Sequence, residues 1–164
     1  MPGTLEHLDM ATTEPRADPF LPHVELVLQS LRITRERLAS RSKVAIDTRL
    51  LRTLLQTLAA QLPFDADFYL AENDDIAIAH DRGEITDLHR HFIESGYFEG
   101  RFGAPPSVDE AFYAATYGDI GAAIRSGQLA SGTEHYMRSG AAEGRLPSES
   151  LRPQVERWAS VLSD

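Results

Sequence analysis

The chain has 164 residues, contains no cysteine and carries a formal net charge of -9. The lack of cysteine excludes disulfides and thiolate metal sites, and the acidic balance argues against nucleic-acid binding, because phosphate recognition needs a basic surface. Mean hydropathy is -0.29, and no apolar run approaches the ~18 residues of a membrane span. Residues 1–22 contain four prolines and no basic, apolar leader. We therefore expect a disordered N-terminal tail and a cytoplasmic protein.

Residues 23–62 contain neither glycine nor proline and show helical apolar spacing. They predict a long N-terminal helix, or a helical hairpin if the polar stretch at 40–43 interrupts it. From residue 46 the apolar stripe is wider than a two-stranded coiled coil requires. It can be a core face, a self-association surface or both. The candidate interface residues are Ile46, Leu50, Leu51, Leu54, Leu55 and Leu58.

Positive charge is concentrated in one part of the chain. Residues 32–52 carry seven basic side chains against two acidic ones, whereas the chain from Asp65 onward is strongly acidic. One interpretation is a helix with a solvated basic face. A second is a basic helix that docks on the acidic half of its own chain or of a second molecule, and a third is a role at a nucleic acid or a membrane surface.

The second half of the chain contains an internal repeat. Residues 64–103 align without a gap with residues 108–147, at an offset of 44 positions, and about one residue in three is identical. A unit of this length buries its apolar face by packing on a neighbour. We assign repeat 1 to 63–105, repeat 2 to 106–149, and a short C-terminal capping helix to 150–164. Residues that both repeats keep are expected to build the unit, and residues in only one repeat are candidates for function.

Each repeat predicts three helices and no strands. Asp65 and Asp109 are expected N-caps, while duplicated glycines are expected to end the second and third helices. These glycines are Gly83, Gly127, Gly96 and Gly140. The Phe-Tyr pairs at 68–69 and 112–113 are expected in the core. The sequence thus predicts an all-α protein: the N-terminal helix or hairpin, two tandem three-helix repeats, and a last helix whose apolar face clamps onto the core. That face comprises Val155, Trp158, Ala159 and Leu162.

An arginine follows Glu-Gly in both repeats, at Arg101 and Arg145. A guanidinium group forms bidentate pairs with carboxylates and also binds helix-terminal carbonyls. A structural pairing with Asp75 and Asp119, or with a helix end, fits the duplication. The alternative is a ligand site in which the two arginines grip an acidic glycan or a partner's carboxylate.

Neither the histidines nor the sequence motifs indicate catalysis or metal binding. His91 and His135 are duplicated and are expected to be buried, each donating to a backbone carbonyl. His89 lies two residues from His91 and so on a different helix face, which argues against a metal site with His80 or Glu94. The chain has no glycine-rich phosphate loop, no nucleophile elbow and no H-E-x-x-H. We expect no enzyme activity, no metal and no cofactor.

The pattern of Phe-Tyr, Asp-Ile, His-Phe/Tyr and Gly-x-x-Glu-Gly-Arg resembles a short repeat of bacterial proteins. That repeat occurs in polysaccharide-pathway glycosyltransferases, in rhamnan-synthesis-F-like proteins and in adhesin-like proteins. This chain departs from it at Asp74 and Gly118, where proline is usual. The resemblance implies a non-catalytic module attached to polysaccharide or cell-surface machinery. The expected function is a self-associating or partner-binding adaptor of such machinery, and the alternative is a small module that binds an acidic glycan.

Overall fold

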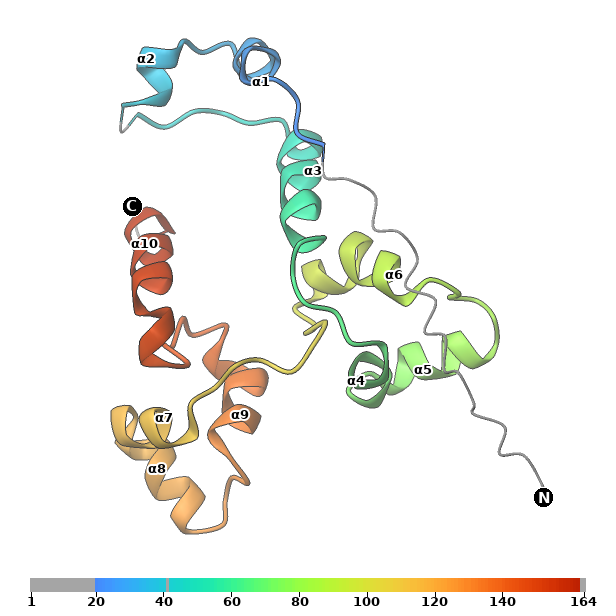
Figure 1. Ribbon diagram of the computed structural model, residues 1–164, viewed down its shortest axis with the longest axis vertical. Coiled ribbons are helices and arrows are strands. Elements are labelled where there is room, and N and C mark those ends of the chain that lie inside the picture. The colour runs from blue at the N-terminus through green and yellow to red at the C-terminus, as the bar shows by residue number, and fades with distance from the viewer. Residues whose placement is uncertain (1–19, 41, 163–164) are drawn as a thin grey trace, which may run out of the picture. The chain divides into compact units, whose positions relative to one another are not determined.

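The computed structural model describes residues 20–40 and 42–162, and throughout these residues the regular elements are helices, without a strand (Figure 1). The all-α prediction is therefore confirmed for the part of the chain described. Apart from residues 20–22, the expected disordered tail lies outside the described residues. The chain divides into two compact units after Leu58. None of the described helices has the length and apolar character that a membrane crossing requires.

The N-terminal unit contains three helices, α1 (Val24–Leu31), α2 (Arg35–Leu38) and α3 (Thr48–Ala59). The prediction of one long helix or a two-helix hairpin is wrong. Arg32 ends α1 because it adopts a left-handed conformation, with φ of 53°, and its N–H bonds back to the last turn. Thr34 then starts α2 by accepting a hydrogen bond from a backbone N–H of the first turn. Neither break contains the glycine or proline that would mark it in the sequence.

Of the leucine face predicted at 46–58, all members except Ile46 lie in helix α3, which begins at Thr48. Asp47 opens the helix, since its Oδ1 accepts the backbone N–H of Arg49 at 2.8 Å. Within the face, Leu51 and Leu58 are 41% and 55% exposed. The remaining members are half-buried, namely Ile46, Leu50, Leu54 and Leu55. The polar residues of α3 lie on the opposite side of the helix.

Repeat 1 folds into α4 (Ala66–Ala71), α5 (Asp74–Asp81) and α6 (Leu88–Glu94), followed by a 3-10 helix, Gly96–Glu99. The expected N-cap is confirmed, because the Asp65 side chain accepts the backbone N–H of the third helical residue. The three helices bury one apolar cluster. Its buried members are Tyr69, Ile76, Leu88 and Phe92.

Repeat 2 folds into α7 (Glu110–Thr116), α8 (Gly118–Arg125) and α9 (Gly132–His135), which continues as a π-helix, Tyr136–Gly140. Asp109 caps α7 as expected, through the same side-chain bond that opens α4. As in repeat 1, the second helix ends at a glycine with positive φ, Gly83 at 71° and Gly127 at 76°. This conformation favours glycine because it has no Cβ.

The last helix is α10 (Arg152–Leu162), which follows a 3-10 helix, Glu149–Leu151. The expectation that its apolar face packs on the core is not met. None of its residues is buried. Trp158 is 56% exposed and Leu162 76%, while Val155 is half-buried. An amphipathic pattern indicates that a helix has an apolar face, but the pattern does not show which surface covers that face.

Candidate functional site

Each repeat is built around a buried tyrosine bonded to a histidine. Tyr69 and Tyr113 are completely buried. The Oη of Tyr69 lies 3.0 Å from Nδ1 of His91, and the Oη of Tyr113 lies 3.0 Å from Nδ1 of His135. The expectation that these histidines donate to a backbone carbonyl is wrong. The tyrosine hydroxyl is the partner because, once buried, it needs a hydrogen bond of its own.

The tyrosine hydroxyl also explains why both repeats keep a glycine five residues after the histidine. A Cβ at Gly96 would stand 2.2 Å from the Tyr69 Oη, and a Cβ at Gly140 would stand 2.3 Å from the Tyr113 Oη. Neither glycine has a positive φ. As expected, helix α6 ends just before Gly96 and the π-helix of repeat 2 ends at Gly140. Both glycines also leave room for a tyrosine hydroxyl oxygen.

Burial raises the pKa of both tyrosines. The pKa of Tyr113 is raised to about 12, chiefly by desolvation, although the nearby charge of Arg145 acts in the opposite direction. The pKa of Tyr69 is raised for the same reason and is opposed by Arg101. Both hydroxyls therefore stay protonated at neutral pH, and they serve as hydrogen-bonding groups of the interior rather than as nucleophiles.

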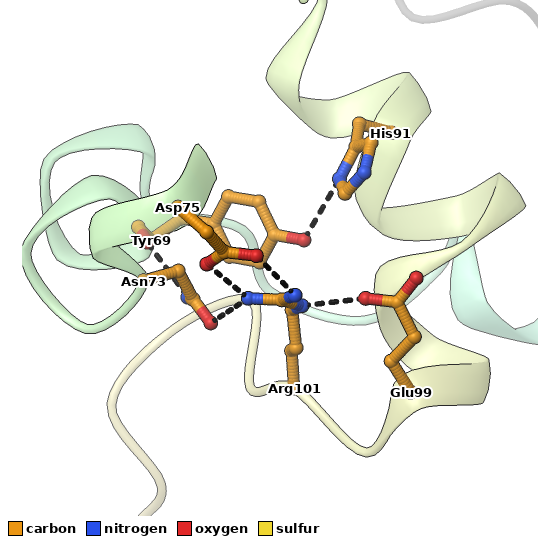
Figure 2. A network of polar contacts seen from close by, with 6 residues as sticks. All are labelled: Tyr69, Asn73, Asp75, His91, Glu99 and Arg101. Carbon is orange, nitrogen blue, oxygen red and sulfur yellow. Dashed lines mark hydrogen bonds and ion pairs between the residues drawn. The ribbon is translucent and has the colours of Figure 1, made fainter. Parts of the chain in front are cut away.

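Arg101 joins the end of repeat 1 to the start of α5 (Figure 2). Its Nη1 and Nη2 donate to the two oxygens of Asp75 at 2.8 and 2.7 Å. Nη1 also donates to Asn73 Oδ1 at 2.7 Å, and Nε donates to Glu99 Oε2 at 2.7 Å. Asn73 in turn donates to the backbone oxygen of Tyr69. All three guanidinium nitrogens thus bind acceptors within the same repeat.

The charges of this network stabilise one another. The hydrogen bonds from Arg101 hold the pKa of Asp75 below its usual value, and Asp75 is the main cause of a raised pKa at Arg101. The Arg101 side chain is 22% exposed, whereas that of Asp75 is 63% exposed, so solvent screens the pair on the aspartate side. The predicted structural pairing of Arg101 with Asp75 is confirmed.

Arg145 contacts the equivalent glutamate and aspartate of repeat 2, but its distance to the aspartate is longer than that of Arg101. Its Nε donates to Glu143 at 2.6 Å, while its Nη2 lies 3.6 Å from Asp119. Tyr117 stands where repeat 1 has Asn73, and the guanidinium carbon of Arg145 lies 4.7 Å from the centre of the Tyr117 ring. A cation–π contact therefore replaces the amide hydrogen bond. The predicted pairing with Asp119 is confirmed as an ion pair.

Repeat 2 contains a polar clamp that the sequence analysis missed. The carboxylate of Glu110 accepts the backbone N–H groups of Gly132 and Thr133 at 2.6 and 2.9 Å, and the Thr133 hydroxyl at 2.6 Å. Burial raises the pKa of Glu110, but these hydrogen bonds outweigh it and the pKa is lowered. The clamp ties α7 to the start of α9. Ala66 stands at the position of repeat 1 that is equivalent to Glu110. This difference between the repeats is the only feature of the sequence that could have indicated the hydrogen bonds of Glu110.

The side chains considered for a metal site point to separate partners. His80 Nδ1 lies 2.7 Å from the Ile85 carbonyl oxygen, and the His89 ring packs 4.8 Å from the Phe64 ring. Glu94 accepts a hydrogen bond from Arg90. Over residues 20–40 and 42–162, no three His, Asp or Glu side chains come together in a way that could hold a metal ion.

Of the residues predicted for a site, those of the leucine face of α3 remain. The duplicated tyrosines, histidines and arginines all have partners inside their own repeats, so they hold the repeats together. Leu51 and Leu58, by contrast, present large apolar side chains to solvent. Comparisons with protein-family models, with curated proteins and with solved structures found no match to this chain.

Proposed function

We propose that this protein is a non-enzymatic structural subunit or adaptor that associates with itself through the leucine face of α3. The observation that carries the proposal is the exposure of Leu51 and Leu58, seven residues apart on one helix face. Apolar side chains grouped on one surface of an acidic, water-soluble chain are typical of an interface. In this proposal, α3 makes the contact and the acidic half of the chain is the scaffold.

The scaffold is, in this proposal, a tandem of two equivalent three-helix units. The supporting observations are the matched tyrosine–histidine bonds and the matched ion pairs of Arg101 and Arg145. The alternative function, a binding module that grips an acidic glycan through these arginines, has weaker support. All three side-chain nitrogens of Arg101 already donate to protein acceptors, so a ligand would have to replace bonds that hold the repeat together.

The class of client follows from the repeat resemblance. We propose a cytoplasmic protein that serves polysaccharide or cell-envelope assembly, with a glycosyltransferase or another protein of that machinery as its client. The repeat pattern of Phe-Tyr, Asp-Ile and Glu-Gly-Arg resembles a repeat found in proteins of that kind, and this resemblance implies a non-catalytic module. A pull-down from native lysate against tagged protein tests the client class independently of self-association.

The self-association is tested with matched substitutions on the two faces of α3. Leu51→Gln with Leu58→Gln removes the exposed apolar side chains, and Thr53→Gln, at an exposed polar position of the same helix, is the control. We expect light scattering to show an oligomer for the wild type and the control, and a monomer for the leucine variant. Circular dichroism checks that each variant keeps its helices. A leucine variant that assembles like the wild type would contradict the proposal.

A further inference from the structure

A groove in the second compact unit is lined by residues of both repeats. Repeat 1 contributes residues 72–73 and 99–102, and repeat 2 contributes residues 133–134 and 137–138. The groove has a volume of about 540 Å³, which lies within the range of about 300–1,000 Å³ that is usual for small-molecule sites. Because both repeats supply its lining, the groove is a product of their tandem arrangement and not of either repeat alone.

Several polar side chains that line the groove are already used inside the protein. Arg101 donates hydrogen bonds to Asn73 and Glu99, as Figure 2 shows. The Thr133 hydroxyl donates to the carboxylate of Glu110. These bonds hold the repeats together, so we do not assign these groups to a ligand.

The carboxylate of Glu134 is also used inside the protein, and this leaves Arg138 without its nearest acidic neighbour. In repeat 1 the equivalent positions hold Arg90 and Glu94, which pair one turn apart at 2.8 Å. Repeat 2 has the opposite order of charges, and the same pairing does not form. Oε2 of Glu134 instead accepts the backbone N–H of Ala130 at 2.7 Å, at the start of α9.

The local backbone also distinguishes Arg138 from its counterpart in repeat 1. Arg138 lies in the π-helix Tyr136–Gly140, whereas Glu94 lies in the regular helix α6. Single turns of π-helix occur frequently at functional sites. The Arg138 side chain is exposed and has no hydrogen-bond or ion-pair partner among the described residues. Arg138 is thus a free guanidinium group that only repeat 2 places at the groove.

Repeat 1 supplies a free group of the opposite charge. Glu72 lines the groove, is exposed, and its carboxylate has no partner within residues 20–40 and 42–162. The equivalent residue of repeat 2 is Thr116, so this carboxylate is not needed to build the unit. Between these charged groups in composition are two half-buried apolar side chains, Phe102 and Met137. The groove therefore offers a carboxylate, a guanidinium group and an apolar surface.

We propose that this groove binds an amino-acid zwitterion with an apolar side chain, either free or as a dipeptide. Arg138 binds the ligand's carboxylate, Glu72 binds its ammonium group, and Phe102 and Met137 contact its apolar side chain. A ligand with a negative charge alone would be repelled by Glu72, and one with a positive charge alone would be repelled by Arg138. The proposal does not depend on the self-association through α3.

The two charges are tested by titrating the full chain with phenylalanine and with two blocked derivatives, followed by two-dimensional NMR. N-acetylphenylalanine lacks the positive charge, and phenylalaninamide lacks the negative charge. We expect phenylalanine to shift the signals of the groove residues saturably, and each blocked derivative to bind about tenfold more weakly. No saturable shift at about 10 mM phenylalanine or alanylphenylalanine would overturn the proposal. Equal binding of phenylalanine and either derivative would also overturn it.

The dipeptide alanylphenylalanine distinguishes the two sources of the zwitterion. Tighter binding of the dipeptide than of phenylalanine would support the proposal with a peptide as the ligand. Weaker binding of the dipeptide would support it with a free amino acid as the ligand.

Substitutions then assign each charge of the ligand to its residue. Arg138→Gln is expected to bind phenylalanine as weakly as phenylalaninamide, because the carboxylate has lost its partner. Glu72→Gln is expected to bind phenylalanine as weakly as N-acetylphenylalanine. Arg125→Gln and Glu84→Gln are the charge-matched controls, at exposed positions that do not line the groove. Controls that weaken binding as much as the groove variants would overturn the assignment.

A variant of the other candidate surface separates this inference from the proposed function. The Leu51→Gln, Leu58→Gln variant is expected to bind phenylalanine with the affinity of the wild type, whatever its state of association. Normal self-association without phenylalanine or dipeptide binding would overturn this inference alone. A monomeric wild type that binds phenylalanine with both charge preferences would support this inference and contradict the proposed self-association.

Discussion

Arg101 binds both carboxylate oxygens of Asp75, 26 positions earlier in the chain, at 2.7 and 2.8 Å. This bidentate pair connects the exit of repeat 1 to the first turn of α5. The equivalent pair in repeat 2, Arg145 with Asp119, has a single approach of 3.6 Å. The same two residue types therefore pair at different distances in the two repeats, and the third partner also differs, Asn73 in repeat 1 and Tyr117 in repeat 2.

Replacing Arg101 is expected to destabilise the second unit. Arg101→Ala leaves Asp75, Asn73 and Glu99 without their common donor. Because the Asp75 and Glu99 side chains are 63% and 47% exposed and water can solvate them, we expect the free energy of unfolding to fall by about 1 kcal/mol. Arg145→Ala is expected to cost less, because its contact with Asp119 is longer. Urea denaturation followed by circular dichroism measures both effects.

The control for this prediction is an arginine whose ion pair is fully on the surface. Arg90 bonds Glu94 one turn along α6, with side-chain exposures of 71% and 52%. Exposed pairs of this kind contribute little to stability. Arg90→Ala is therefore expected to leave the unfolding midpoint nearly unchanged. An Arg101→Ala variant as stable as Arg90→Ala would show that the network does not hold the repeat.

Substitution of Gly96 is expected to disrupt the tyrosine–histidine bond of repeat 1. In Gly96→Ala the new Cβ would meet the Tyr69 Oη at 2.2 Å but the ring carbon behind it at 3.3 Å. Overpacking of this kind costs typically ~1–3 kcal/mol. Adding Tyr69→Phe removes the clashing oxygen, so the double variant should recover part of the stability that Gly96→Ala loses.

A double-mutant cycle in thermal denaturation measures this coupling. Gly118→Ala provides the control, because a Cβ at that glycine meets nothing within 4 Å. It is expected to be neutral or slightly stabilising, since alanine favours helix more than glycine does. Strictly additive effects of Gly96→Ala and Tyr69→Phe would show that the hydroxyl does not require the glycine.

The raised pKa of Tyr113 predicts a loss of stability in alkali. Its pKa is about 12 in the folded chain, against about 10 for an unfolded tyrosine. The folded state therefore favours the protonated phenol. This contribution to stability is fully present below about pH 10 and is lost as pH rises toward about 12. Urea denaturation of wild type and Tyr113→Phe between these pH values should show a steeper loss for the wild type.

If Tyr113→Phe keeps the pH dependence of the wild type, burial of the Tyr113 hydroxyl does not contribute to the alkaline loss of stability.

Several features could be predicted from the sequence because they depend on neighbouring residues or on duplication. Asp65 and Asp109 cap their helices through local bonds, and local bonds follow from residue type and spacing. The pairing of Arg101 with Asp75 was accessible because both residues recur in repeat 2. Duplication thus supplied a comparison that a single unit could not give.

Other features depend on tertiary contacts that periodicity does not contain. The end of α1 at Arg32 lies in a stretch without glycine or proline, and a left-handed arginine leaves no sequence signal. The exposed face of α10, including Trp158, has the same pattern as a buried face. The bond between His91 and Tyr69 joins residues 22 positions apart, and only the packed repeat brings them together.

The most direct test of the central claim, self-association through α3, is sedimentation equilibrium of the wild-type chain over a range of concentrations up to tens of micromolar. The account predicts a mass above the 18.2 kDa of one chain, falling toward that value on dilution and on substitution of Leu51 and Leu58 by Gln. A mass of one chain at every concentration would contradict it.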